Sequence, residues 1–195
     1  MTLKHDIRSL EAPVELRTVD GGGNVAAGYA ALFDIPADIG GAWTEVIARG
    51  TFSKALDGDV LALVDHDYGR VIGRSTAGTL RLSEDQHGLA VEIDLPDTSD
   101  GRDLAVQLRR KDIKGMSFGF RVTHDEWDET VSPPKRTIHE VDLIEVSAVA
   151  RPAYPDTELG MRSLEAARKE RRAHNFDHAA RRLRMKISLD LKGRE

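Results

Sequence analysis

The chain has 195 residues, of which 40% are hydrophobic and 31% charged, enough for one folded domain with a substantial core. It contains no cysteine, which excludes disulfides and thiolate zinc sites and fits a reducing cytoplasm. Charged residues interrupt residues 1–16 and no apolar run could span a bilayer, so we expect neither a signal peptide nor a membrane segment.

Charge is unevenly distributed along the chain. Residues 161–195 hold 11 Lys and Arg against 5 Asp and Glu, a net charge of +6, whereas residues 1–160 carry −11. We therefore predict an acidic globular domain over residues 1–160 and a basic tail with a different purpose over residues 161–195.

The first hundred residues favour short strands joined by turns. Residues 24–33 form an apolar run that follows three glycines. Residues 60–64 form a second run that stops before Asp65, so His66 is expected at or near a strand end. Alternation about a turn signal then predicts a hairpin from residues 79–82 and 89–95.

Two helices are expected. Thr51 offers an N-cap oxygen for a short helix over residues 51–56. A longer helix is predicted over residues 99–111, with Ser99 or Asp100 as its cap. Its apolar face would consist of Leu104, Ala105 and Leu108.

Two strands are predicted after the longer helix. The first contains Ser117 in the sequence Gly-Met-Ser-Phe-Gly-Phe, and the second covers residues 136–150. An antiparallel return of the second strand beside the first is the simplest topology.

His66 and Ser117 are the candidates for chemistry. A serine hydroxyl is a weak nucleophile at neutral pH and needs an adjacent base, for which histidine is the best-suited side chain. Taken singly, Ser117 is more often a small residue in a crowded strand, and His66 a loop or core histidine. Each of the two residues lies where an apolar strand meets a glycine-rich stretch of the chain, a place where a side chain is presented at a surface. Together they favour a serine hydrolase.

Glu145 is the third candidate. A carboxylate within the apolar strand 136–150 needs a partner, and an imidazole N–H would be one. A salt bridge to an arginine explains it equally well. Spacing does not choose among the acidic and imidazole groups of this strand, which also include His139, Glu140 and Asp142.

Several ordered blocks of the chain together resemble the prohead (capsid maturation) serine proteases of tailed bacteriophages, which are related to the herpesvirus assembly proteases. The resemblance covers nearly all of residues 28–156. The blocks are residues 28–30 with Phe33, 50–52, 63–67 with 72–74, 95–98, 115–120, and 143–147 with 151–153.

The resemblance implies an α+β fold, a small and mostly antiparallel β-barrel surrounded by a few helices. It also implies a serine endopeptidase inside the immature procapsid, in the cytoplasm of a bacterial host. Its substrates would be scaffold or the scaffold-like arm of the major capsid protein, and its own chain. The herpesvirus relatives pair, so a homodimer is left open, while no cofactor, membrane or specific nucleic-acid partner is implied.

By this resemblance His66 and Ser117 carry over directly as catalytic residues. Glu145 stands where the herpesvirus enzymes have a second histidine, so it is the expected third member, with Glu140 its nearest rival. Ser117 would attack the scissile carbonyl, His66 would carry the proton, and Glu145 would orient the imidazole. The backbone around Arg151 is the expected source of oxyanion donors.

Other interpretations compete with this one. The same strands could form a non-enzymatic capsid or scaffold module, in which Ser117 and His66 only pack. A metal hydrolase built on Asp65, His66, Asp67 and His139 is disfavoured, because their spacing is not that of the usual zinc motifs.

The basic tail also has two interpretations. It is either a solvated terminus or a basic amphipathic helix that docks on acidic capsid or scaffold segments. The residues that recur at helical spacing are Phe176, Ala179 or Ala180, Leu183 and Ile187.

Overall fold

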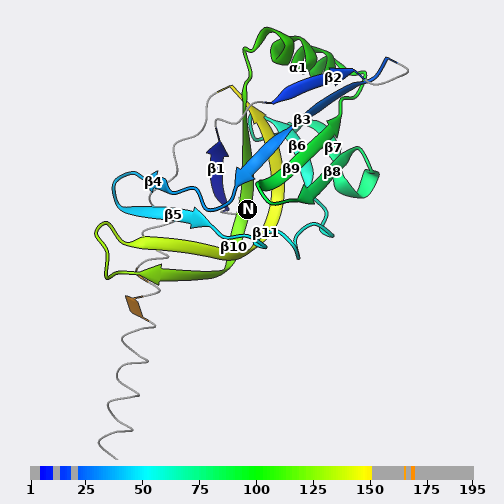
Figure 1. Ribbon diagram of the computed structural model, residues 1–195. Coiled ribbons are helices and arrows are strands. Elements are labelled where there is room, and N and C mark those ends of the chain that lie inside the picture. The colour runs from blue at the N-terminus through cyan, green and yellow to red at the C-terminus, as the bar shows by residue number, and fades with distance from the viewer. Residues whose placement is uncertain (1–4, 11–13, 19–21, 151–164, 166–167, 170–195) are drawn as a thin grey trace, which may run out of the picture. The chain divides into compact units, whose positions relative to one another are not determined.

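The computed structural model describes residues 5–10, 14–18, 22–150, 165 and 168–169 (Figure 1). The chain divides into two compact units, residues 1–156 and 157–195, and almost all described residues belong to the first. The predicted boundary at residue 160 and the predicted tail helix lie outside the described residues. Within the described part, no helix is long and apolar enough to cross a membrane.

The described elements are mostly strands. They are β1 (Asp6–Leu10), β2 (Glu15–Thr18), β3 (Asn24–Leu32), β4 (Ala37–Ile39), β5 (Trp43–Ile47), β6 (Leu61–Val64), β7 (Asp67–Arg74), a 3-10 turn (Ser75–Ala77), β8 (Leu80–Glu84), β9 (Gly88–Asp94), α1 (Ser99–Arg110), β10 (Gly115–Asp128) and β11 (Lys135–Val149).

The long antiparallel pair β10 and β11 organises the larger sheet (Figure 1). The order of its main path is β1-β10-β11-β5-β4, and β6 also pairs with β11 and with β7. Both β5 and β6 run parallel to β11, at its beginning and its end respectively. The β10–β11 ladder contains register shifts between residues 119 and 125, and Figure 1 shows both strands bending strongly.

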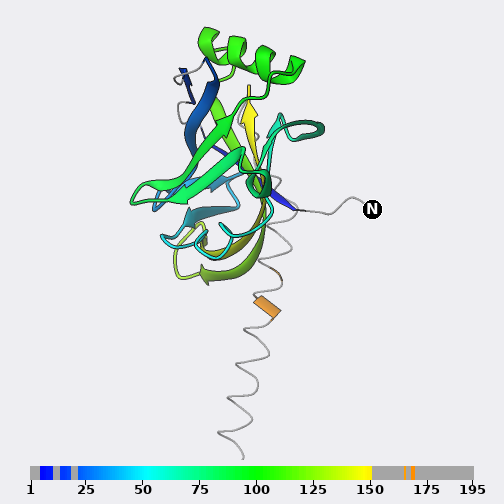
Figure 2. The same ribbon diagram turned by 90° about the vertical axis from the view of Figure 1, so that its right-hand side faces the viewer.

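The smaller sheet has the order β2-β3-β9-β8 and shares one apolar core with the larger sheet. Leu89 and Val91 of β9 belong to the same buried cluster as Phe118, Phe120 and Val146 of the β10–β11 pair. α1 lies at one end of the sheets (Figures 1 and 2) and buries its predicted apolar face. Burial of such a core supplies the main driving force for folding.

Most of the predicted elements are confirmed. The apolar runs became β3 and β6, the predicted hairpin is β8–β9, and β11 returns antiparallel beside β10. The longer helix is confirmed as α1, but Thr98 is its cap, because the Thr98 hydroxyl accepts the Gly101 N–H at 3.3 Å.

Two expectations differ from the structure. Residues 51–56 form consecutive turns, since the Thr51 hydroxyl donates to the carbonyls of Ala48 and Ile138 instead of capping a helix. A closed barrel surrounded by helices is not confirmed: the described strands form two separate sheets, and α1 is the single α-helix of the first unit's described residues. The fold is mostly β.

Candidate active site

The register of β10 on β11 places four small or polar residues on one face of the larger sheet. Ser117 lies opposite Ser147, and Gly119 lies opposite Glu145. Directly opposed residues of an antiparallel pair share a face and have neighbouring Cβ atoms. Ser117, Glu145 and Ser147 each have 0% exposure, so this face forms a buried polar cluster.

His66 reaches the cluster from a tight turn between β6 and β7. Asp65 and His66 have φ values of 50° and 60°, the left-handed conformation of a two-residue hairpin turn. This conformation costs energy for residues other than glycine and persists where surrounding contacts fix it. Here the Asp65 N–H donates to the Ala148 carbonyl at 3.0 Å, and the His66 N–H donates to the Ser147 hydroxyl at 3.2 Å.

The His66 side chain pairs with Glu145. Its Nδ1 lies 2.8 Å from Glu145 Oε1, and the Ser147 hydroxyl donates to Glu145 Oε2 at 2.6 Å. Both carboxylate oxygens are therefore bonded, as a fully buried carboxylate requires. The other imidazole nitrogen, Nε2, is buried and has no hydrogen-bond partner among the described residues. With Nδ1 as the donor, Nε2 is the free basic nitrogen of the ring.

Gly119 is required for the carboxylate to lie where it does. A Cβ atom on residue 119 would come within 2.5 Å of Glu145 Oε1 and within 2.9 Å of the His5 ring. Real Cβ atoms do not approach so closely, so any larger residue would displace Glu145 or His5. The glycine that follows Ser117 by two residues therefore makes room for the histidine–carboxylate pair.

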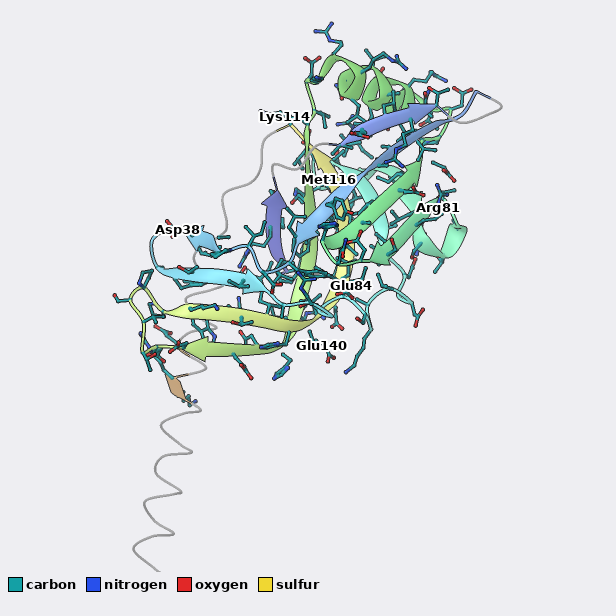
Figure 3. The ribbon with its side chains drawn as sticks, viewed as in Figure 1. Asp38, Arg81, Glu84, Lys114, Met116 and Glu140 are labelled. Atoms are coloured by element: carbon teal, nitrogen blue, oxygen red, sulfur yellow. The ribbon has the colours of Figure 1, made fainter. Side chains whose placement is uncertain are left out.

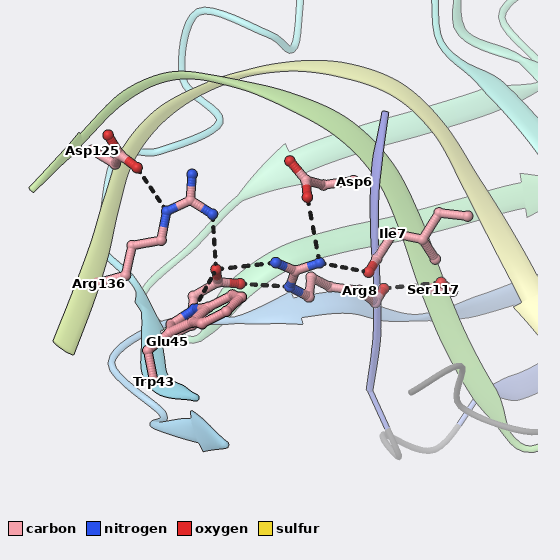
Figure 4. A network of polar contacts seen from close by, with 8 residues as sticks. All are labelled: Asp6, Ile7, Arg8, Trp43, Glu45, Ser117, Asp125 and Arg136. Atoms are coloured by element: carbon pink, nitrogen blue, oxygen red, sulfur yellow. Dashed lines mark hydrogen bonds and ion pairs between the residues drawn. The ribbon is translucent and has the colours of Figure 1, made fainter. Parts of the chain in front are cut away.

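Ser117 is on the same face, but its hydroxyl bonds to β1. Ser117 Oγ donates to the Arg8 carbonyl at 2.9 Å and accepts the Ser9 hydroxyl at 2.8 Å. No hydrogen bond joins Ser117 to His66 within the described part of the chain. Figure 4 shows the Ser117 side chain directed at the Arg8 backbone.

The rivals of Glu145 lie elsewhere. Glu140 is about one-third exposed and pairs with Lys54 at 2.7 Å, and Figure 3 shows it far along the ladder from Met116, the neighbour of Ser117. Asp142 is exposed and lies 3.9 Å from Arg121. His139 pairs with Glu126 at 3.4 Å.

The residues of the alternative metal site are not brought together. In the parts of the chain that the structure describes, no group of three or more His, Asp or Glu side chains could hold a metal ion. Asp65 Oδ1 instead accepts the Ala150 N–H at 3.3 Å. Arg151, expected beside the oxyanion, lies outside the described residues.

A second buried polar cluster was not found from the sequence (Figure 4). Glu45 accepts bonds from Arg8 at 2.5 and 3.1 Å and from Arg136 at 3.1 Å, while Trp43 Nε1 lies 3.4 Å away. Burial opposes the charge of Glu45, but the two guanidinium groups outweigh it and lower the Glu45 pKa. No spacing rule joins residues 8, 45 and 136, so only the fold could reveal this cluster.

The first cluster has the parts of a serine peptidase. A buried carboxylate bonds an imidazole whose second nitrogen has no partner in the part of the chain that the structure describes, and a serine lies one strand away on the same face of the sheet. A family comparison gives the same class: the family described as caudovirus prohead serine protease matches residues 12–170. The chain belongs to this family and is a serine peptidase of bacteriophage capsid maturation.

Comparison with solved structures found the capsid assembly protease gp21 of bacteriophage T4. The two chains are 13% identical, with a TM-score of 0.49, over 73% of this chain and 94% of the T4 chain. No curated protein matches the chain.

Proposed function

We propose that Ser117, His66 and Glu145 are the catalytic triad of an endopeptidase that acts inside the phage procapsid. Its substrates are scaffold segments or the scaffold-like arm of the major capsid protein, together with its own chain. The observation that carries the triad is the 2.8 Å contact between His66 Nδ1 and Glu145 Oε1, with Nε2 left unbonded. Family membership supports the class of substrate.

The triad would work through four atoms. Ser117 Oγ attacks the scissile carbonyl carbon while His66 Nε2 takes its proton, and Glu145 stabilises the imidazolium through Nδ1. Nε2 then returns the proton to the leaving amine, and a water molecule repeats the cycle on the acyl-enzyme. The Ser117 hydroxyl must first turn from the Arg8 carbonyl to Nε2.

Ser147 is a positioning residue in this proposal. Its hydroxyl bonds both the carboxylate of Glu145 and the backbone N–H of His66, so one side chain fixes the two partners relative to each other. Rotation of a carboxylate or ring away from its productive geometry reduces catalysis even where every residue is present.

The test is the intact mass of the major capsid protein, encoded in the same phage genome, after incubation with this chain. We expect truncated products with the wild type and at least about 10³-fold slower cleavage with Ser117→Ala. Ser53→Ala is the matched control, because it also removes a hydrogen-bonded serine hydroxyl, but an exposed one that bonds Glu84 at 2.7 Å. Equal cleavage by the wild type and Ser117→Ala would exclude Ser117 as nucleophile.

A homodimer also remains a prediction. Dimerisation would make specific activity rise with protein concentration.

A further inference from the structure

The strand beside the nucleophile belongs to the N-terminal segment of the same chain. β1 is the last strand of the main path of the larger sheet and pairs antiparallel with β10, with Ser9 directly opposite Ser117. Without β1, the backbone groups of β10 next to Ser117 would form an open sheet edge. Such an edge binds an extended peptide by adding it as a strand.

β1 makes direct contacts with the proposed triad. The Ser117 hydroxyl bonds two groups of β1, the Arg8 carbonyl and the Ser9 hydroxyl. His5, the residue before β1, also lies close to this site. A Cβ atom on residue 119 would meet both the His5 ring and the Glu145 carboxylate. With β1 in place Ser117 is completely buried, so a substrate carbonyl cannot reach it.

Polar contacts hold β1 in place. None of residues 6–9 belongs to the buried apolar core, and Arg8 is the buried side chain among these four. If β1 left the sheet, Glu45 would keep its bond to Arg136, so no carboxylate would be orphaned. The buried core between the two sheets is built by residues of other elements, so undocking of β1 would be a local event.

We propose that the edge of β10 at Ser117 is the peptide-binding edge of the enzyme and that residues 5–10 of the same chain occupy it in the resting state. The substrate is then an extended peptide that replaces β1. This inference rests on the proposed function of Ser117. It adds that the enzyme is closed by its own N-terminal strand, and the family match, which begins at residue 12, does not include that strand.

The experiment measures how fast a fluorophosphonate labels Ser117 in the full chain, by intact mass. Ser117 Oγ forms the bond to phosphorus, fluoride leaves, and the serine proton is lost. Arg8→Glu places a negative charge against buried Glu45 and should release β1. We expect labelling to be at least about tenfold faster than in the wild type, because the accessible fraction of the protein rises.

The matched control is Arg17→Glu, the same charge reversal in β2. Arg17 is 60% exposed and makes only ion pairs of 3.7 and 3.9 Å, so this variant should label at the wild-type rate. A synthetic peptide with the sequence of residues 5–10 should slow labelling of Arg8→Glu, and a scrambled peptide should not. Slower labelling in the presence of this peptide would show that Arg8→Glu acts by removing β1 from β10, and not by destabilising the whole domain.

Hydrogen exchange of the wild type gives a second measurement that needs no variant. We expect the amides of β1 and the β10 amides bonded to it to exchange together, at least about 100-fold faster than the amides that join β10 to β11. Equal protection of both ladders would show that β1 is a permanent strand and would overturn the proposal.

The labelling outcomes separate the two claims. Equal labelling of the wild type and Arg8→Glu would overturn the closure by β1 and leave Ser117 as the nucleophile. Absence of labelling in both proteins, with β1 amides released in Arg8→Glu, would overturn the catalytic role of Ser117 and the peptide edge with it.

Discussion

Two buried polar clusters both include residues of β11, and they differ in whether every polar atom has a hydrogen-bond partner. Around Glu45, two arginines and a tryptophan N–H contact the carboxylate. Around Glu145, the carboxylate is equally well bonded, but its histidine partner has a buried nitrogen with no partner among the described residues. A general base needs such an unbonded nitrogen, because a nitrogen whose lone pair is already in a hydrogen bond is not available to take the proton of a serine hydroxyl.

The comparison also separates two roles for a buried carboxylate. Glu45 balances permanent charges, since arginine does not lose its proton. Glu145 faces an imidazole, which gains and loses charge during a catalytic cycle. The Glu45 cluster should therefore contribute mainly to stability and the Glu145 cluster mainly to rate, a division that can be tested by substitution.

The largest expected effect is the loss of rate on replacing Glu145. Glu145→Gln should reduce cleavage by about 10³- to 10⁴-fold, because an amide no longer holds the imidazole in the right tautomer or stabilises its cation. Glu140→Gln is the matched control on the same strand and should keep full activity, since Glu140 pairs only with exposed Lys54. Comparable losses in both variants, measured as initial rates of capsid-protein cleavage, would refute the assignment.

The next effect is a loss of stability on replacing Glu45. Glu45→Gln removes the charge between two buried guanidinium groups and should lower the free energy of unfolding by about 3–5 kcal/mol. Asp94→Asn is the control, because Asp94 also accepts two bonds from one arginine but is about half exposed, and it should cost less than about 1 kcal/mol. Urea unfolding measures both, and similar losses would show that burial is not the deciding factor.

The candidate residues could be picked out from the sequence, whereas the contacts that join them could not. Ser117 and His66 stood out because polar residues interrupt apolar strands there, and such interruptions can be read locally. Glu145 could be proposed but not chosen over Glu140 from spacing, since the choice depends on the turn that brings His66 to β11.

The remaining features depend on contacts between distant segments. The bonds from β1 to Ser117 join residues more than one hundred positions apart, and no local pattern records them. The same holds for the Arg8–Glu45–Arg136 cluster. The missing short helix at residues 51–56 has the same physical cause, because Thr51 bonds the carbonyl of Ile138 in β11.

The smallest expected effect concerns Asp6, the neighbour of Arg8 in β1. Burial raises the pKa of Asp6 although Arg8 and Arg136 oppose the shift, whereas the pKa of Glu45 is lowered. A raised carboxyl pKa means that the folded state binds the proton more tightly, so this contribution to stability is lost as pH rises through the Asp6 pKa. Glu45 acts in the opposite direction, and its contribution is lost as pH falls.

Asp6→Asn should therefore stabilise the protein at neutral pH and not in acid. At pH 7 we expect a gain of about 1 kcal/mol, or about 2–4 °C in Tm, because the variant no longer buries a charged carboxylate. The difference from the wild type should shrink as pH falls through the Asp6 pKa, where the wild-type carboxyl becomes neutral as well. Melting curves between pH 3 and pH 7 test this, and a difference that grows in acid would show that the Asp6–Arg8 ion pair outweighs desolvation at this end of β1.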